Sequence, residues 1–188
     1  LRRTSNTRFI EQHLDEVEIH YGTLTHRASL QGAARGMECV IHCAGKTKAI
    51  RAEEYFRVNR DGTANMVELA NRHSSELKQF IHVSSRAVNG PATTENPTRE
   101  ADPPAPISDY GRSKMEAERV VTEQCEIPWT VLRPSGVYGP RHTDFLGAFR
   151  AVSWHILPLF DGGHQEMNLV YGPDVAAATL RCLGADAA

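Results

Sequence analysis

The chain has 188 residues, of which 40% are hydrophobic and 23% are charged, and its formal net charge is −2. This length suits one domain with a hydrophobic core, and the near-neutral charge gives no basis for binding nucleic acid or a membrane surface. No apolar run approaches the roughly 18 residues of a membrane-spanning helix, and no segment resembles a signal peptide, so we expect a cytoplasmic protein.

The first predicted elements lie between residues 17 and 73. Residues 17–21 alternate apolar and polar side chains, which indicates a strand, and residues 27–36 read as a short helix that ends at a glycine. Residues 39–44 form a nearly continuous apolar run, as expected for a strand covered on both faces in a parallel sheet. A long helical pattern follows over about residues 52–73.

The second half of the chain continues the alternation. Residues 80–84 predict a strand, and residues 89–106, rich in Pro, Thr and Asn, predict a long loop of the kind that is often functional. Ser108 is placed to cap a helix that runs to about Gln124. The remaining predicted elements are a strand at 129–132, a helix at 145–154, an extended segment at 167–170 and an Ala-rich helix at 174–183.

Strands that alternate with helices predict an α/β fold with an open parallel sheet. Ligands of such sheets bind beyond the carboxyl ends of the strands. The residues that follow the predicted strands, at 44–46, 84–85 and 133–135, are therefore the first candidates for a binding site.

Tyr110 and Lys114 are four residues apart in a predicted helix, so their side chains lie on one face. A phenol has an ordinary pKa of about 10 and is a poor base near neutrality, but a neighbouring ammonium group lowers that pKa. The pair then suits proton transfer during the interconversion of a hydroxyl and a carbonyl group. The hydroxyl of Ser85, at the end of a strand, could hold the same oxygen. Taken alone, such a pair is common on exposed helices.

Six motifs in order give this pair its context. They lie at residues 40–45 (VIHCAG), 59–65 (NRDGTAN), 83–90 (VSSRAVNG), 110–114 (YGRSK), 132–140 (LRPSGVYGP) and 168–176 (NLVYGPDVA). Together they resemble the extended short-chain dehydrogenase/reductase family. This family includes NAD(P)-dependent sugar-nucleotide epimerases and dehydratases and enzymes similar to 3β-hydroxysteroid dehydrogenase. The resemblance covers nearly the whole chain.

The resemblance implies a Rossmann-like, doubly wound parallel sheet that lacks its first βαβ unit. Leu1 aligns near the end of the family's second strand, and none of the 14 glycines forms a G-x-G-x-x-G motif. Residues 1–140 would then form a partial NAD(P)-binding domain. Residues 141–188 would form a small, partial substrate-binding region interleaved with the last elements of the sheet.

The resemblance also implies roles for individual residues. Tyr110 would be the catalytic acid/base, Lys114 would bond the nicotinamide ribose and lower the pKa of Tyr110, and Ser85 would be the catalytic serine. Asn59 would be a structural and proton-relay neighbour. The residues expected to contact the cofactor are Thr23, Leu24, Ala44, Gly45, Asn59, Ser84, Tyr110, Lys114, Pro134 and Val137.

One departure from the family pattern and one open choice concern the cofactor. Thr23 stands where the family usually has an aspartate that contacts adenine, so the resemblance implies weaker or altered binding of adenine. Arg2 and Arg3 are placed to favour the 2′-phosphate of NADP, but they equally suit a solvated basic pair, so NAD and NADP both stay open.

No metal site is predicted, because no cysteine–histidine spacing matches one. His42 and His82, on apolar strands, are expected to be core or edge residues with satisfied hydrogen bonds rather than ligands. Cys39 and Cys43 are expected to pack as small hydrophobic residues.

The expected function is an NAD(P)-dependent oxidoreductase or epimerase/dehydratase that acts at a secondary alcohol or ketone. A nucleotide sugar is the first choice of substrate, and a sterol or flavonoid-like alcohol is the second. The partner is a small molecule, with homodimer formation left open. Two alternatives stand beside this function: a non-catalytic dinucleotide sensor or scaffold on the same fold, and an inactive fragment of an enzyme.

Overall fold

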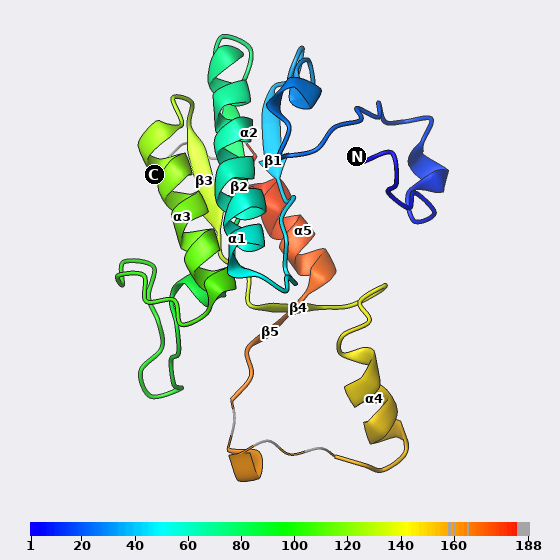
Figure 1. The fold of residues 1–188 in the computed structure, drawn as a ribbon. Helices are drawn as coiled ribbons and strands as arrows, with labels where there is room; N and C mark the ends of the chain where they lie inside the picture. The colour runs from blue at the N-terminus through cyan, green and yellow to red at the C-terminus, as the bar shows by residue number, and fades with distance from the viewer. Residues whose placement is uncertain (158, 160, 165, 184–188) are drawn as a thin grey trace.

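The computed structural model describes residues 1–157, 159, 161–164 and 166–183. Its centre is a parallel sheet in the order β1-β2-β3, as predicted (Figure 1). A separate parallel pair, β4 and β5, follows beyond the ends of these strands. The strands are β1 (Cys39–His42), β2 (Gln79–Val83), β3 (Trp129–Leu132), β4 (Gly136–Tyr138) and β5 (Leu169–Tyr171).

From residue 52 onward the helices agree with the predicted ones, with one irregularity. The pattern at 52–73 becomes α1 (Ala52–Tyr55), a π-helical turn (Phe56–Arg60) and α2 (Asp61–Arg72). A π-helical turn inside a helix often marks a functional site. Ser108 caps α3 (Asp109–Gln124) as predicted, because its hydroxyl accepts a hydrogen bond from the backbone N–H of Gly111 at 3.0 Å.

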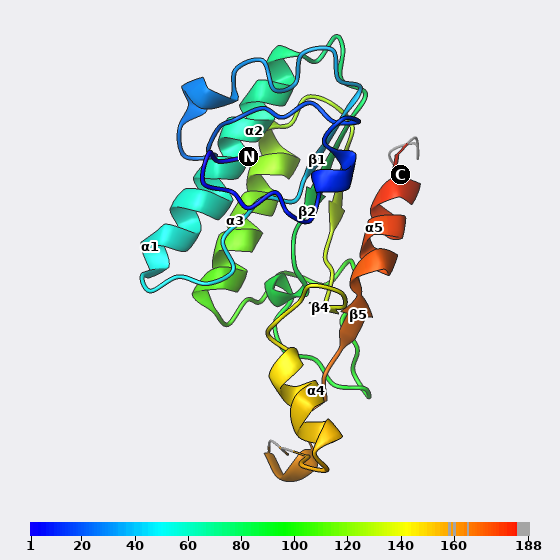
Figure 2. The ribbon, with the colours of Figure 1, turned by 90° about the vertical axis from the view of Figure 1, so that its right-hand side faces the viewer.

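The sheet lies between two layers of helices (Figures 1 and 2). Helices α2 and α3 cover one face, and α5 (Gly172–Arg181) lies on the other. The hydrophobic core fills the space between the sheet, α2 and α3, where the side chains of Phe80 and Val121 are fully buried. On the opposite face, Nε2 of Gln79 donates to the carbonyl oxygen of Cys182 at 2.7 Å and ties the end of α5 to the start of β2.

The predicted strand at residues 17–21 is wrong. The segment pairs with no strand of the described residues, and Val17 and Tyr21 are exposed. Alternation gives a strand only where a neighbour accepts its hydrogen bonds and a core covers one face, and here β1 is the edge strand. The predicted helix at 27–36 is also shorter, since only a 3-10 turn (Arg27–Leu30) forms before a series of turns.

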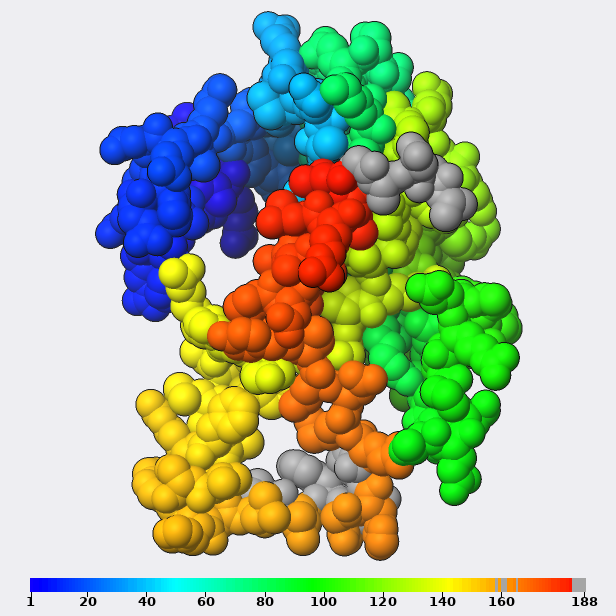
Figure 3. Space-filling view, turned by 180° about the vertical axis from the view of Figure 1, so that it is seen from behind, coloured from blue at the N-terminus to red at the C-terminus, as the bar shows by residue number. Residues whose placement is uncertain are grey.

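The region after residue 140 is built differently. Helix α4 (Leu146–Ser153) has no buried residue, and it projects beyond the sheet (Figures 1 and 3). Residues 158, 160, 165 and 184–188 of the proposed substrate region lie outside the described residues. No helix that the structure describes is both long and apolar enough to cross a membrane.

Candidate active site

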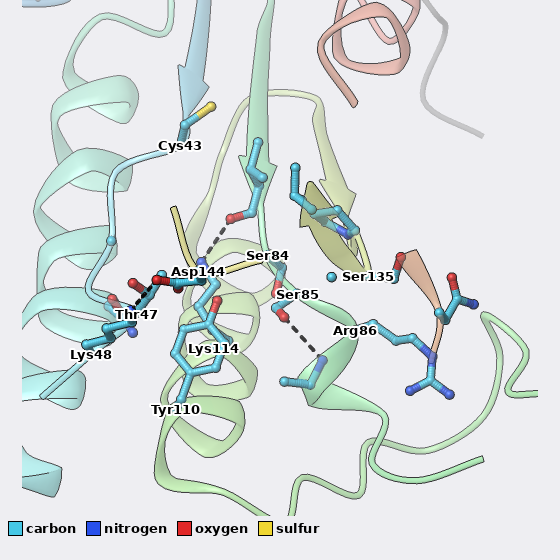
Figure 4. Close-up of a pocket in the computed structure, with 18 of the residues that line it drawn as sticks. Cys43, Thr47, Lys48, Ser84, Ser85, Arg86, Tyr110, Lys114, Ser135 and Asp144 are labelled. Atoms are coloured by element: carbon cyan, nitrogen blue, oxygen red, sulfur yellow. Dashed lines mark hydrogen bonds and ion pairs between the residues drawn. The ribbon is translucent and has the colours of Figure 1, made fainter. Parts of the chain in front are cut away.

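A cavity of about 640 Å³ opens at the carboxyl ends of β1, β2 and β3 (Figure 4). We call it the strand-end cavity. Its walls come from the segments that follow β1 and β2, from the first turns of α3, and from residues around β4. The residues that line it are Cys43, Gly45, Thr47, Lys48, Asn59, Val83, Ser84, Ser85, Arg86, Ala87, Tyr110, Lys114, Pro134, Ser135, Gly136, Val137, His142, Asp144 and Asn168.

Asn59 fixes the wall that follows β1. It lies in the π-helical turn and is almost completely buried. Its Oδ1 accepts from the backbone N–H of Lys46 at 2.7 Å, while its Nδ2 donates to the carbonyl oxygen of Lys46 and to Oγ of Ser113. A Cβ atom on Gly45 would lie 3.1 Å from this Oδ1. Asn59 therefore joins the loop after β1 to α3 and leaves little room for a side chain at residue 45.

Gly111 brings the start of α3 close to the segment that follows β2. A Cβ atom at this position would lie 2.4 Å from the carbonyl oxygen of Ala87, a distance that no real side chain allows. Tyr110 precedes Gly111 and Ser85 lies two residues before Ala87, so this approach brings Tyr110 and Ser85 to the same cavity (Figure 4). The hydroxyl of Ser85 also accepts from the backbone N–H of Ala87 at 3.2 Å.

Lys114 lies one helical turn after Tyr110 and is buried, with 5% of its surface exposed. Its Nζ donates to the carbonyl oxygen of Val83 at 2.9 Å, which fastens α3 to the end of β2. Burial lowers the pKa of Lys114 to about 8, although the Glu118 carboxylate opposes this shift. Lys114 is therefore mostly protonated at neutral pH, but it titrates much closer to neutrality than an exposed lysine.

The pKa of Tyr110 differs from the expectation. Burial raises the pKa of this phenol above its ordinary value, and hydrogen bonding by Ser85 lowers it by a smaller amount. Lys114 does not produce the predicted decrease in the pKa, because desolvation dominates and the ammonium group is directed at the Val83 carbonyl. In this structure Tyr110 is a protonated phenol near neutrality.

Two buried groups at the base of the site lack hydrogen-bond partners. The hydroxyl of Ser84 lines the cavity, yet it is buried and bonds to none of the described residues. His82 is fully buried in β2, and neither of its ring nitrogens has a partner, so the prediction of a satisfied histidine is wrong at this position. The prediction is confirmed at His42, which bonds to Oγ1 of Thr63 at 3.0 Å.

Charged side chains line the outer walls of the strand-end cavity. Nζ of Lys48, after β1, lies 2.7 Å from Oδ1 of Asp144, after β4, so an ion pair connects the two walls (Figure 4). His142 faces the same carboxylate at 3.9 Å. Arg86 extends on the other side of Ser85. Its guanidinium bonds to the carbonyl oxygen of Gly90 at 3.2 Å and to Oγ1 of Thr98 at 3.4 Å.

The cavity brings together eight of the eleven residues that the sequence analysis selected: Gly45, Asn59, Ser84, Ser85, Tyr110, Lys114, Pro134 and Val137. Ala44, Thr23 and Leu24 do not line it. The backbone N–H of Thr23 donates to Oγ of Ser29, and Leu24 packs where a side chain on Gly62 would lie. Contact of Thr23, Leu24 and Ala44 with the cofactor stays a prediction.

The sequence analysis did not select several residues of the cavity. Arg86 and Ala87 follow Ser85 directly, so the position of that motif could have indicated them. Asn168 likewise begins the motif at 168–176, whereas Lys48 and Asp144 carried no such signal, because their meeting depends on how distant segments fold. Among the described residues, no group of three or more His, Cys, Asp or Glu side chains is arranged to hold a metal ion.

Comparison with known proteins decides the family. The model of the NAD dependent epimerase/dehydratase family matches residues 2–188. The chain belongs to this family. It is 35% identical over 156 residues to UDP-glucose 4-epimerase of Vibrio cholerae, covering 77% of this chain and 47% of the relative. It is 33% identical over 163 residues to ceramide reductase of Caulobacter vibrioides, covering 86% of this chain and 45% of the relative.

Solved structures confirm the Rossmann-like fold of the family. The dTDP-glucose 4,6-dehydratase of Bacillus anthracis, in complex with NAD, matches with a TM-score of 0.80 at 21% identity. The match covers 98% of this chain and 61% of that chain. The chain thus spans about half the length of the curated relatives it matches.

Proposed function

We propose that the chain carries the catalytic part of an NAD(P)-dependent oxidoreductase or epimerase/dehydratase. The reaction takes place at a secondary alcohol or the corresponding ketone, with a nucleotide sugar as the substrate. The observation that carries this proposal is the meeting of Ser85, Tyr110 and Lys114 in one cavity at the carboxyl ends of the parallel strands. Membership of the epimerase/dehydratase family and the similarity to a UDP-glucose 4-epimerase support it.

The strand-end cavity suits the nicotinamide end of NAD(P). The hydroxyl of Ser84 is buried there without a partner, and such a group gains from a ligand that bonds to it. Gly45 offers a backbone surface without a side chain, while Pro134 and Val137 provide apolar surface for a flat ring. When bound, the nicotinamide ring accepts or returns the hydride, and the protein controls position and protons.

The chain's own residues would move one proton at the substrate oxygen. Because burial keeps Tyr110 protonated near neutrality, its hydroxyl is ready to donate a proton to a ketone oxygen. In the reverse direction the phenolate form of Tyr110 would accept the proton from the alcohol. Ser85 would bond to the same oxygen and hold it in place. Lys114 has two further N–H donors beyond its bond to Val83, which suit ribose hydroxyl groups.

Residues from the second region would complete the substrate side. His142 and Asn168, from this region, line the cavity together with Ser135, which follows β3. We therefore assign residues 141–188 to substrate binding and residues 1–140 to the cofactor. The choice between NAD and NADP stays open, since Arg2 and Arg3 are exposed and lie outside the strand-end cavity.

The substitution Tyr110→Phe tests the proposal. We expect a decrease in turnover of about 10²- to 10⁴-fold, because the proton donor is lost. The affinity for NADH should stay near that of the wild type, as measured by fluorescence titration. Tyr21→Phe, at an exposed tyrosine far from the cavity in sequence, is the matched control and should not change turnover.

Two outcomes would contradict the proposal. Near-normal turnover by Tyr110→Phe on a panel of nucleotide sugars would exclude Tyr110 as the acid/base. Binding of NADH by the wild type, without oxidation in the presence of any ketone tested, would favour the non-catalytic sensor.

A further inference from the structure

Arg86 places a guanidinium group in the strand-end cavity, beyond Ser85 as seen from Tyr110 (Figure 4). The residue directly follows Ser85, and its half-buried side chain lines the same cavity. Figure 4 shows it extending from the turn after β2, on the side of Ser85 that is away from Tyr110. A cation in this position can contact a part of the substrate other than the reacting oxygen.

The other cations of the cavity differ from Arg86 in their partners. Lys48 forms an ion pair with Asp144. Lys114 donates to the Val83 carbonyl, and the negative charge of Glu118 partly offsets the lowering of its pKa by burial. For Arg86, the described part of the chain provides no carboxylate within ion-pair distance. Its two hydrogen bonds, to Gly90 and Thr98, are long and go to uncharged oxygens.

We infer that Arg86 binds a carboxylate group that the substrate carries next to the carbon that reacts. This inference rests on the proposed function and narrows its substrate to an acidic sugar, a uronate, within the class of nucleotide sugars. A hexose without the carboxylate would leave the Arg86 cation without an anionic partner.

The geometry favours a carboxylate over a neutral hydroxyl group. A guanidinium has five N–H donors in a planar fork, of which the bonds to Gly90 and Thr98 use two. The remaining donors match the two oxygens of a carboxylate, and such charge-assisted pairs are shorter and stronger than neutral hydrogen bonds. The bonds to Gly90 and Thr98 also hold the side chain in place, so less conformational entropy is lost on binding.

The position of Arg86 distinguishes the proposed ligand, a carboxylate on the sugar, from the diphosphate of a nucleotide sugar. Ser85 is proposed to bond the reacting oxygen, and Arg86 is the next residue along the chain. Its ligand should therefore lie on the same sugar ring as the reacting oxygen. The diphosphate is joined to the opposite side of that ring, at the anomeric carbon.

A matched pair of ligands tests the inference. UDP-glucuronate and UDP-glucose differ only in a carboxylate in place of a hydroxymethyl group. With the full chain saturated with NADH, isothermal titration should show that UDP-glucuronate binds more tightly than UDP-glucose. Arg86→Gln should weaken UDP-glucuronate binding by about 10- to 100-fold, because a charged hydrogen bond is lost. The same variant should leave UDP-glucose binding unchanged, and Arg86→Lys should fall between the two proteins.

Arg112→Gln is the control, because this arginine is exposed on α3, pairs with Asp109 and lies outside the cavity. It should bind both ligands like the wild type. Equal affinity of the wild type for the two ligands would overturn the inference. An equal loss for both in Arg86→Gln would place the diphosphate at Arg86 and would also overturn it. Failure of the wild type to bind NADH would instead reject the proposed function.

Discussion

The region around β1, β2 and β3 and the region around α4 differ in how deeply their side chains are buried. Around β1, β2 and β3 the side chains are closely packed, and Phe80 and Val121 are fully buried. In the region around α4 large apolar side chains face outward, with Phe149 56% and Trp154 71% exposed. The three proposed catalytic residues all belong to the first region, where the packed core holds the strands and α3 that carry them.

The strand-end cavity lies where the two regions meet. Its inner wall rests on the core through buried contacts, as with Asn59 and Lys114. Its outer wall is held by contacts such as the ion pair between Lys48 and Asp144, whose side chains are both exposed. Exposed ion pairs contribute little to stability, so the substrate side of the cavity is the easier side to rearrange.

The largest expected effect is a loss of stability when the core of the first region is disrupted. Phe80→Ala removes a fully buried ring from the core and should lower the free energy of unfolding by about 3–5 kcal/mol, as measured by urea denaturation. The same substitution at the exposed Phe149 should cause little change. Similar losses at the two positions would show that the regions do not differ as described.

A smaller effect is expected where α3 is tied to the end of β3. The buried carboxylate of Glu118 accepts three hydrogen bonds from the guanidinium of Arg133, at 3.0, 3.1 and 2.6 Å. Glu118→Gln should reduce stability by about 2 kcal/mol, because Arg133 loses its charge partner while it is still partly buried. It should also lower the pKa of Lys114 further, since the Glu118 carboxylate raises it.

Glu123→Gln provides the control on the same helix. Glu123 pairs with Arg119, and both side chains are well exposed. Thermal unfolding of this variant should match that of the wild type. If Glu123→Gln were as destabilising as Glu118→Gln, burial would not be the cause of the larger effect.

The third effect depends on pH. Burial lowers the pKa of His42 to about 4 and of His82 to about 2, from an ordinary value of 6.5. Below pH 6.5 the unfolded chain therefore binds protons that the folded chain does not. Stability should decrease with falling pH, by about 1 kcal/mol for each histidine at about pH 5.5.

His82→Leu sharpens this prediction. It removes one of the two titrating groups and should flatten the decrease in stability between pH 6.5 and 4. At pH 7.5 the variant should be as stable as the wild type or more so, because the ring nitrogens of His82 have no partner to lose. The same substitution at the exposed His164 should leave the pH dependence unchanged.

The sequence predicted the first region well because its signals are local. The strand at 129–132 was predicted at its observed bounds, and the capping residue Ser108 defined the start of α3. The strand predicted at 17–21 was wrong because the alternation of apolar and polar residues does not show whether a neighbouring strand is present to pair with it. The motif around Tyr110 was found from spacing, but the direction of its pKa shift depends on burial, which spacing does not report.

Contacts between distant segments set the limit of sequence analysis at the site. Lys48 and Asp144 are 96 residues apart, and nothing in either segment indicates the other. The role of Gly111 could not be predicted from the sequence either, because only the folded structure shows that the carbonyl oxygen of Ala87 excludes a side chain there. Arg86 lay inside a selected motif, yet its importance became visible only when the other cations were seen to have partners.

The central claim is that the strand-end cavity takes the nicotinamide end of the cofactor, and Ser84→Ala tests it most directly. The Ser84 hydroxyl has no partner among the described residues, so removing it should not lower the unfolding temperature. We predict that the dissociation constant for NADH, from fluorescence titration, increases about tenfold, while Ser153→Ala on α4 has no effect. Unchanged NADH affinity in Ser84→Ala would contradict the account.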